Sequence, residues 1–192
     1  MKRFKLSASN ISSAAILVFC LILLFSPGAK AFVLQGLMKV GLFQVEPNSA
    51  YPAEAKLVPE MSFKNSEGKI TDLRDLRGKV VFVNFWATWC PPCRAEMPSI
   101  EKLYQSSKAN DSIVFIMVDV DGNLANSRKF MDKRKYSLPV YSVEGTIPET
   151  LFRGSVPTTF ILNKHGEIVF LHEGVADYSA KKVSDYLAQL SK

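Results

Sequence analysis

Cysteine and histidine are scarce in this sequence, which has three cysteines and two histidines among 192 residues. A secreted domain held together by structural disulfides would carry more cysteines at wider spacings. Cys20 lies within an apolar N-terminal run, so Cys90 and Cys93 are the pair that remains for the rest of the chain. One close pair in a domain otherwise free of cysteine indicates thiols whose oxidation state changes during function.

A basic surface of the kind that binds nucleic acid is also missing. Residues 1–31 hold four of the 24 basic residues and none of the 18 acidic ones. Removing those four leaves 20 basic against 18 acidic residues, so most of the net charge of +6 lies at the N-terminus. Because a nucleic-acid interface needs a basic stripe on the folded domain, we expect no nucleic-acid partner.

The first 31 residues have the pattern of an export signal. A positively charged start, Met1–Lys5, precedes a mostly apolar run from Ile11 to Phe25, and Ala29-Lys30-Ala31 fits a small-x-small cleavage site. An uncleaved membrane anchor is the alternative. The run is short against the ~20 residues that span a bilayer, although a start near Leu6 would lengthen it. In either case the rest of the chain is sent outside the cytoplasm, and we favour a tethered chain.

The segment 32–56 is expected to be amphipathic at first and then a linker. Four of its apolar residues are spaced to share one helical face: Leu34, Leu37, Met38 and Leu42. Such a face could lie on a membrane surface or pack on the globular domain. Three prolines between Glu46 and Pro59 indicate a linker. The folded domain is therefore expected over residues 57–192.

Strand and helix patterns alternate along this domain. Runs of β-branched and aromatic residues typical of buried strands occupy residues 80–85, 113–118 and 158–162. Helices are expected over about 91–107, 123–135 and 179–190, the last capped by Ser179, and Asp72 is expected to cap a short helix over Leu73–Leu76. Turn signals at residues 65–68 and 163–166 predict hairpins. Residues 139–143 are expected to form a short strand. The alternation predicts an α/β sandwich around a central sheet.

The Cys90-Pro91-Pro92-Cys93 motif stands at the expected start of a helix. Unpaired N–H groups and the helix dipole favour a thiolate there, so Cys90 is the expected attacking thiol. Cys93 lies one turn further in and is placed to resolve a mixed disulfide. Pro91 and Pro92 are tolerated because first-turn N–H groups have no intrahelical partner to lose. We expect this redox-active disulfide to work without a bound cofactor.

A zinc site is the alternative for this cysteine pair. A structural zinc ion needs four ligands, usually from two such pairs. His165 and His172 would have to supply the other half, yet they flank a hairpin strand and are loosely spaced. We therefore expect no metal and interpret both histidines as solvent-facing.

The stretch from Phe85 to Arg94 resembles the active-site segment of the thioredoxin superfamily. The Pro-Pro pair between the cysteines, followed by Glu96 and Pro98, resembles its TlpA/ResA-like branch of extracytoplasmic reductases. The resemblance runs from about Leu57 to the C-terminus. It implies a thioredoxin-like three-layer sandwich, with a central mixed sheet flanked by helices and an extra helix–strand insertion within residues 119–156.

The resemblance also implies how a substrate binds. Val156-Pro157 matches the cis-proline loop that faces the disulfide and receives the substrate backbone, which the backbone of Val156 would pair with. Trp86 is expected to pack in the core, and Trp89 to form a partly exposed docking surface. The expected substrate-binding residues are Trp89, Pro91, Pro92, Val156 and Pro157.

Asn84 occupies the position where cytoplasmic thioredoxins carry a buried acid that manages the proton of the second cysteine. Asn cannot titrate, so that role is vacant. Glu96, three residues after Cys93, shares its helical face and resembles the active-site glutamate of the branch. We expect Glu96 to transfer protons to and from Cys93; the alternative is an ordinary solvated surface charge.

The dipeptide between the cysteines bears on the direction of electron flow. Strong oxidants of this fold usually place a histidine there, which stabilises the thiolate and hence the reduced form. Pro-Pro offers no such donor, which favours a reductant. The resemblance implies protein disulfide clients such as the haem-binding cysteines of apocytochrome c, electrons from a membrane thiol–disulfide donor, and a place in cytochrome c maturation at the outer face of a bacterial cytoplasmic membrane or in the periplasm.

Two other functions are alternatives to a disulfide reductase. A peroxiredoxin-like peroxide reductase is suggested by Thr88-x-Cys90, but the upstream proline and the Thr-x-x-Cys spacing of that family are missing. A redox-inactive binding domain is disfavoured because both cysteines are intact. The sequence therefore predicts an enzyme, a thiol–disulfide oxidoreductase.

Overall fold

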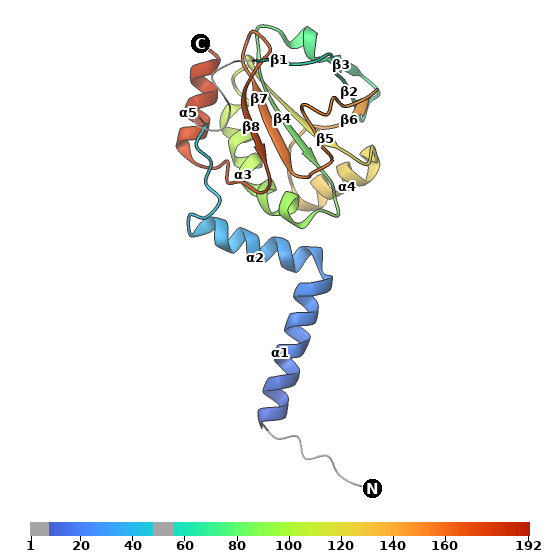
Figure 1. Cartoon of the computed structure of the whole chain (residues 1–192), viewed down its shortest axis with the longest axis vertical. Coiled ribbons are helices and arrows are strands. Elements are labelled where there is room, and N and C mark those ends of the chain that lie inside the picture. Colours follow the sequence, from blue (N-terminus) through green and yellow to red (C-terminus); the bar gives the residue numbers. More distant parts are fainter. Residues whose placement is uncertain (1–7, 48–55) are drawn as a thin grey trace.

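The computed structural model describes residues 8–47 and 56–192. The charged start Met1–Lys5 and most of the expected linker lie outside these ranges, and so does the longer start near Leu6. Figure 1 shows two helices, α1 (Ala8–Phe25) and α2 (Pro27–Lys39), leading into an α/β domain.

Within the described residues, eight strands form one sheet in the order β1-β8-β7-β4-β5-β6-β2-β3. In chain order they are β1 (Lys56–Leu57), β2 (Ser62–Asn65), β3 (Ile70–Asp72), β4 (Val80–Trp86), β5 (Ile113–Asp119), β6 (Val140–Glu144), β7 (Thr158–Leu162) and β8 (Glu167–Glu173). The pairs β4–β5 and β5–β6 are parallel and the others are antiparallel. The expected α/β class and mixed sheet are confirmed.

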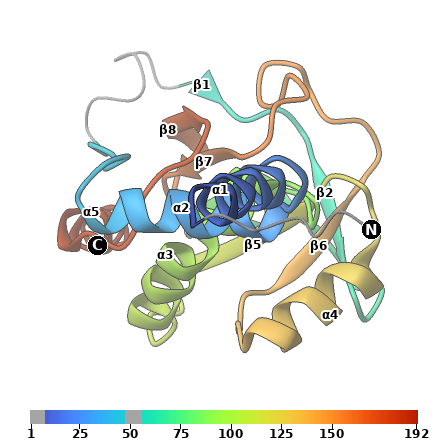
Figure 2. The same cartoon turned by 90° about the horizontal axis from the view of Figure 1, so that it is seen from below.

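The helices of the domain are α3 (Pro91–Ser107), α4 (Leu124–Arg134) and α5 (Lys181–Leu190), with a short 3-10 helix, η1 (Leu73–Leu76). One face of the sheet packs on α3, α4 and α5, through side chains such as Met97, Met131 and Leu187. The other face is covered by Leu73 of η1 and by Leu151. Figure 2 shows α3, α4 and α5 along one side of the sheet.

Strand β4 lies in the middle of the sheet, and all seven of its residues are buried. Its apolar side chains alternate between the two faces: Phe82 and Trp86 belong to the cluster under α3, whereas Val81, Val83 and Phe85 belong to the other. A strand buried on both faces needs a nearly continuous apolar run, which residues 80–85 supply except at Asn84.

Several local predictions are confirmed. Asp72 caps η1 by accepting a hydrogen bond from the Arg74 N–H. Strands β2 and β3 form the expected hairpin, in which the Asn65 side chain accepts from the backbone N–H groups of Glu67 and Lys69. The insertion between β5 and β7 contributes a helix and a strand, α4 and β6.

Two local predictions were wrong. Ser179 does not cap α5, because the helix begins only after Ala180, which provides no side-chain cap; the backbone N–H of Ser179 instead donates to Asp177 Oδ1 at 2.9 Å. The end of the expected linker is a strand, since Lys56 and Leu57 pair with β8. A two-residue edge strand has no periodicity that a sequence could reveal.

Helix α2 packs on the domain, mainly against α3. Ala31 and Met38 are buried against Ala95, with Leu34 beside them. The chain after the helix is attached as well, because the Asp177 N–H donates to the carbonyl oxygen of Phe43 at 2.8 Å and Val45 enters the main core.

The predicted single apolar face of residues 34–42 was wrong in part. Leu34 and Met38 point inward, but Leu37 and Leu42 are 39% and 49% exposed. The reason is that α2 ends at Lys39, so Leu42 lies outside the helical repeat.

The two N-terminal helices meet at a sharp bend. Among the described residues no single helix combines the length and apolar composition needed to cross a membrane, whereas Ser12–Ile22 and Pro27–Lys39 meet both conditions as a pair bent by 93°.

Replacing Phe82 with Ala should lower the free energy of unfolding by about 3–5 kcal/mol, the usual cost of truncating a buried aromatic side chain. Phe82 is fully buried, with its ring centroid 4.9 Å from that of Phe115 and 5.3 Å from that of Tyr178. Urea unfolding of the oxidised protein measures the change. Ile70→Ala is the control, because Ile70 is 54% exposed and should cost less than about 1 kcal/mol. Equal losses in the two variants would contradict the core assignment.

Candidate functional site

The two cysteines form a disulfide at the start of α3, directly after the central strand. The S–S distance is 2.03 Å and the Cα atoms of Cys90 and Cys93 are 5.3 Å apart. Cys90 is the N-cap residue of the helix, and its Sγ accepts a hydrogen bond from the Cys93 backbone N–H at 3.1 Å. Both cysteines are buried in the disulfide form, Cys90 at 2% exposure and Cys93 at 0%.

The prolines remove two donors from the first turn of α3. Pro91 and Pro92 are its first two residues and have no N–H, so Cys93 carries the first amide hydrogen of the helix. A helix start normally offers several unpaired N–H groups to a thiolate. Here one amide serves the Cys90 sulfur.

The loop before β7 lies against this disulfide. The Val156–Pro157 peptide bond is cis, as the resemblance to thioredoxins implies. The carbonyl oxygen of Val156 lies 3.8 Å from Cys90 Sγ. The hydroxyl of Thr158 donates to the Ser155 carbonyl oxygen at 2.7 Å, which holds the loop before the cis bond.

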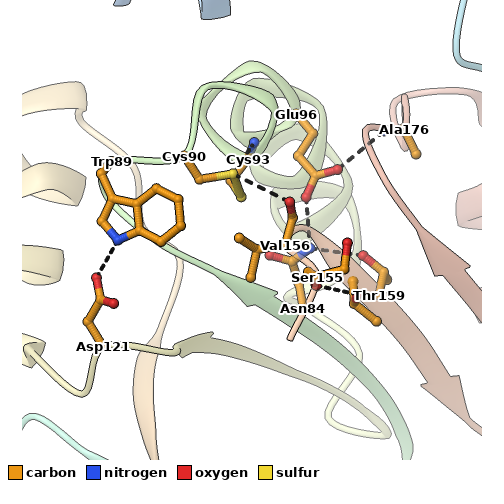
Figure 3. Close-up of a disulfide and its surroundings, with 11 residues drawn as sticks. Asn84, Trp89, Cys90, Cys93, Glu96, Asp121, Ser155, Val156, Thr159 and Ala176 are labelled. Atoms are coloured by element: carbon orange, nitrogen blue, oxygen red, sulfur yellow. Dashed lines mark hydrogen bonds between the residues drawn. A yellow bond between two sulfur atoms is a disulfide. The ribbon is translucent and has the colours of Figure 1, made fainter. Parts of the chain in front are cut away.

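Glu96 is fully buried, which excludes the alternative of a solvated surface charge. Its Oε1 accepts a hydrogen bond from Asn84 Nδ2 at 2.8 Å, and its Oε2 accepts one from the Ala176 backbone N–H at 3.3 Å. Asn84 Nδ2 also donates to Thr159 Oγ1 at 2.9 Å. Figure 3 shows this chain of contacts running from α3 through β4 to β7.

Burial raises the pKa of Glu96 from 4.5 to about 8, because removing the carboxylate from water costs more than its hydrogen bonds with Asn84 and Ala176 return. The carboxyl group therefore holds its proton at neutral pH and exchanges it near that range. A group with such a pKa can both give and take a proton under physiological conditions.

Asn84 fits either protonation state of this carboxyl group. Its amide has both donors and an acceptor, and its Oδ1 is buried without a hydrogen-bond partner among the described residues. A neutral amide also leaves Glu96 as the titrating group of the pair. The buried acid of this site thus lies on α3, whereas cytoplasmic thioredoxins carry theirs on the strand, at the position of Asn84.

Trp89 is 56% exposed beside the disulfide, as expected, and Trp86 is fully buried in the core. The indole Nε1 of Trp89 donates to Asp121 Oδ2 at 2.7 Å, which fixes the ring next to the sulfurs (Figure 3). The exposed ring provides an apolar surface at the mouth of the site.

The remaining candidates lie elsewhere. His165 is exposed and His172 is half-buried on β8. Across residues 8–47 and 56–192, no three or more His, Cys, Asp or Glu side chains are grouped so as to hold a metal ion.

Sequence reasoning missed three contributors to the site: Thr159, Ala176 and Asp121. Thr159 had a signal, because β7 runs antiparallel to β4 and its residue opposite Asn84 is Thr159. Ala176 contributes its backbone N–H, and Asp121 lies in the loop after β5. Neither contribution leaves a recognisable motif in the sequence.

Comparisons with known proteins agree with this geometry. The family model described as Redoxin matches residues 52–190. The thiol-disulfide oxidoreductase ResA of Halalkalibacterium halodurans is 39% identical over 109 residues, which are 56% of this chain and 61% of that relative, so the match spans less than two thirds of its length. The ResA protein of Bacillus thuringiensis (strain Al Hakam) is 31% identical over 172 residues, 89% of this chain and 94% of the relative.

A solved structure shows the same fold. The thiol:disulfide interchange protein, thioredoxin family protein, of Chlorobium tepidum TLS superimposes with a TM-score of 0.57 at 25% identity, over 74% of this chain and all of that one. The expected thioredoxin-like fold is confirmed.

The raised pKa of Glu96 predicts a pH-dependent stability. Between about pH 5 and pH 8 the folded protein keeps the proton that the unfolded chain has lost, so stability should fall as pH rises, by at most about 1.4 kcal/mol per pH unit. Glu96→Gln should flatten this slope, as measured by urea unfolding of the oxidised protein across the range.

Glu149→Gln is the matched control, since Glu149 is exposed. This variant should show the same slope of stability against pH as the parent protein. Parallel pH profiles for Glu96→Gln and the parent would show that Glu96 ionises normally in the folded state.

Proposed function

Because the chain belongs to the Redoxin family and is a thiol–disulfide oxidoreductase similar to ResA proteins, we propose that it reduces disulfides of client proteins outside the cytoplasm. The observation that carries this proposal is a cysteine pair at a helix start with a single amide donor for the Cys90 sulfur, facing a cis-proline loop.

The reaction is a two-step exchange. In the reduced enzyme the Cys90 thiolate attacks one sulfur of a client disulfide, a mixed disulfide forms, and the other client sulfur leaves as a thiolate that takes a proton. The Cys93 thiolate then attacks Cys90 Sγ, which releases the second client thiol. The client gains two electrons, the enzyme ends as the Cys90–Cys93 disulfide, and a dithiol donor must reduce it again.

The direction of electron flow follows from how poorly the site stabilises a thiolate. Within residues 8–47 and 56–192, only the Cys93 N–H donates to Cys90 Sγ, since Pro91 and Pro92 have none. The carbonyl oxygen of Val156 points its negative end at the same sulfur from 3.8 Å. A less stabilised thiolate disfavours the reduced form, which makes the pair a better reductant.

Glu96 is proposed as the proton carrier for Cys93. It lies one turn further along the same face of α3, fully buried, with a pKa raised to about 8 by that burial. A thiol of ordinary pKa near 8.5 and a carboxyl group near 8 are closely matched for proton exchange. Their titrations should be coupled, so the observed pKa values belong to the pair.

Client binding is assigned to the surface around Cys90. The exposed ring of Trp89 and the half-buried Pro91, Pro92 and Val156 are proposed to form this surface, with the buried Pro157 beneath it. Because Pro157 has no N–H, the backbone of Val156 is the group proposed to pair with an extended client segment.

Clients, donor and location are proposed from the family resemblance together with the N-terminal sequence. The likeness to ResA supports a role in cytochrome c maturation, with haem-binding cysteines of apocytochrome c as clients and a membrane thiol–disulfide protein as electron donor. The export pattern of residues 1–31 supports a bacterial extracytoplasmic enzyme tethered by this segment, followed by the segment 32–56 and the catalytic domain 57–192.

A Cys93→Ser variant should trap clients, because the mixed disulfide at Cys90 can no longer be resolved. Cys20→Ser should be the background for all variants, since Cys20 is a free, exposed thiol. Non-reducing gels of the variant expressed in its host should show covalent adducts that disappear with dithiothreitol. The matched control, Cys90→Ser, should form few or none. Equal adducts from both variants, or none from either, would contradict the proposed roles.

Pro92→Ala tests the direction of electron flow. It returns one N–H to the first turn of α3, so the thiolate should gain about one hydrogen bond and the reduction potential should rise by roughly 30 mV, or about 1.4 kcal/mol for two electrons. Pro98→Ala makes the same change two turns away within α3 and should leave the potential unchanged. Glutathione redox titration measures both. A parent potential close to that of strong disulfide oxidants, about −120 mV, would refute a reductant.

A further inference from the structure

Helix α2 carries apolar side chains on two opposite sides. Its inner side packs on the domain, where Ala31 and Met38 are buried against Ala95. Its outer side exposes four apolar residues: Phe32 (76%), Val33 (42%), Leu37 (39%) and, at the C-cap, Val40 (77%). At 3.6 residues per turn these two sets fall on opposite faces. Packing on the domain thus accounts for only half of the apolar surface.

Lysines border the outer face. Lys30 and Lys39 are exposed and project, by the same periodicity, from its two edges. Lysines at the edges of an apolar helix face can keep their ammonium groups in water or near anionic headgroups while their stems lie over apolar surface. The charge pattern fits a lipid surface better than it fits a protein groove.

The preceding helix leads into the same environment. The apolar side chains of α1 are exposed around its whole circumference, from Ile16 and Leu17 (both 61%) to Phe25 (80%). A helix that is apolar on all sides requires an apolar surrounding phase. Its 18 residues make it about 27 Å long, and it does not by itself have the length and apolar composition needed to cross a bilayer. Figure 1 shows α1 projecting away from the domain, with α2 lying across the end of the domain.

We propose that the outer face of α2 is a membrane-docking surface that lies in the interfacial layer of the bilayer that α1 enters. The 93° bend between the helices turns α2 from the direction of α1 into the plane of the surface. Leu42 and Phe43, which follow the helix and are 49% and 40% exposed, are included in the proposed surface. The docking surface consists of Phe32, Val33, Leu37, Val40, Leu42 and Phe43.

The packing of α2 gives its small residues a structural role. Ala31, which the sequence offers as a cleavage site, lies inside a continuous helix and is 5% exposed against α3. Gly28 also lies near α3, where a Cβ would make an ordinary contact 3.6 Å from an Arg94 guanidinium nitrogen. Because Ala31 is part of the packed face of α2, docking requires the N-terminal segment to be retained.

The consequence is a fixed position of the redox site relative to the bilayer. Gln35 Nε2 donates to the Arg94 carbonyl oxygen at 3.2 Å, one residue after Cys93. Gly28, Phe32 and Gln35 share a hollow with Arg94 and Arg134. The start of α3 is thereby clamped to a membrane-bound helix, and the disulfide faces partners at the membrane surface. This inference goes beyond the proposed reductase activity, because lipid contact does not depend on the direction of electron flow.

Fluorescence quenching of the full chain in phosphatidylcholine–phosphatidylglycerol nanodiscs tests the docking surface. In the Cys20→Ser background, with the Cys90–Cys93 disulfide intact, a new cysteine at Val40 is labelled with the environment-sensitive dye NBD. We expect quenching by lipids spin-labelled near the headgroup and shielding from aqueous iodide. The same label at Lys108, exposed at the far end of α3, should show the opposite pattern.

A second variant tests whether the patch itself makes the contact. Phe32→Ser with Val33→Ser should lower lipid quenching of the Val40 label several-fold, while insulin reduction by the enzyme in solution stays unchanged. Iodide quenching at Val40 equal to that at Lys108 would overturn the proposal. So would a Val40 label that is shielded without lipid quenching but transfers energy to a label on another copy, because a second chain would then cover the face. A reductase that fails on insulin but docks would contradict only the proposed function.

Discussion

Burial of β4 on both faces is the constraint on which the rest of the molecule depends. Because Phe82 and Trp86 pack under α3 while Val83 packs on the opposite side, the strand has one possible register in the sheet. That register sets where the chain leaves the sheet, and hence where Cys90 stands at the N-terminus of α3. It also turns Asn84 toward the helix side, where its amide meets Glu96.

The site combines weak stabilisation of the Cys90 thiolate with a buried carboxyl group that holds a proton. Two prolines leave one amide for the Cys90 sulfur, and Glu96 is kept neutral near physiological pH by its burial. Both features disfavour negative charge in the reduced site. A thiolate formed there is reactive because few hydrogen bonds stabilise it. A poorly stabilised thiolate gives up its electrons readily, which is the property a reductant requires.

The N-terminal helices are connected to the redox site through α3. Helix α2 is packed on α3 by small residues and presents a second apolar face outward, bordered by Lys30 and Lys39. The catalytic domain and its proposed membrane attachment therefore share α3 as a common element. A chain tethered by a flexible linker alone would leave the orientation of the disulfide free, whereas a packed helix restricts it.

The sequence by itself determined the fold class, the redox pair and most of its neighbours. Runs such as residues 80–85 have no stable alternative to a buried strand, and a Cys-Pro-Pro-Cys motif at a helix start has a restricted chemistry. Tertiary structure alone decided that Glu96 is buried, since a Glu on a helix is solvated unless other elements cover it, and here Ala176 and Asn84 do so. It also decided the contacts of Asp121 and which side of α2 packs on α3, because these join residues distant in sequence and leave no local pattern.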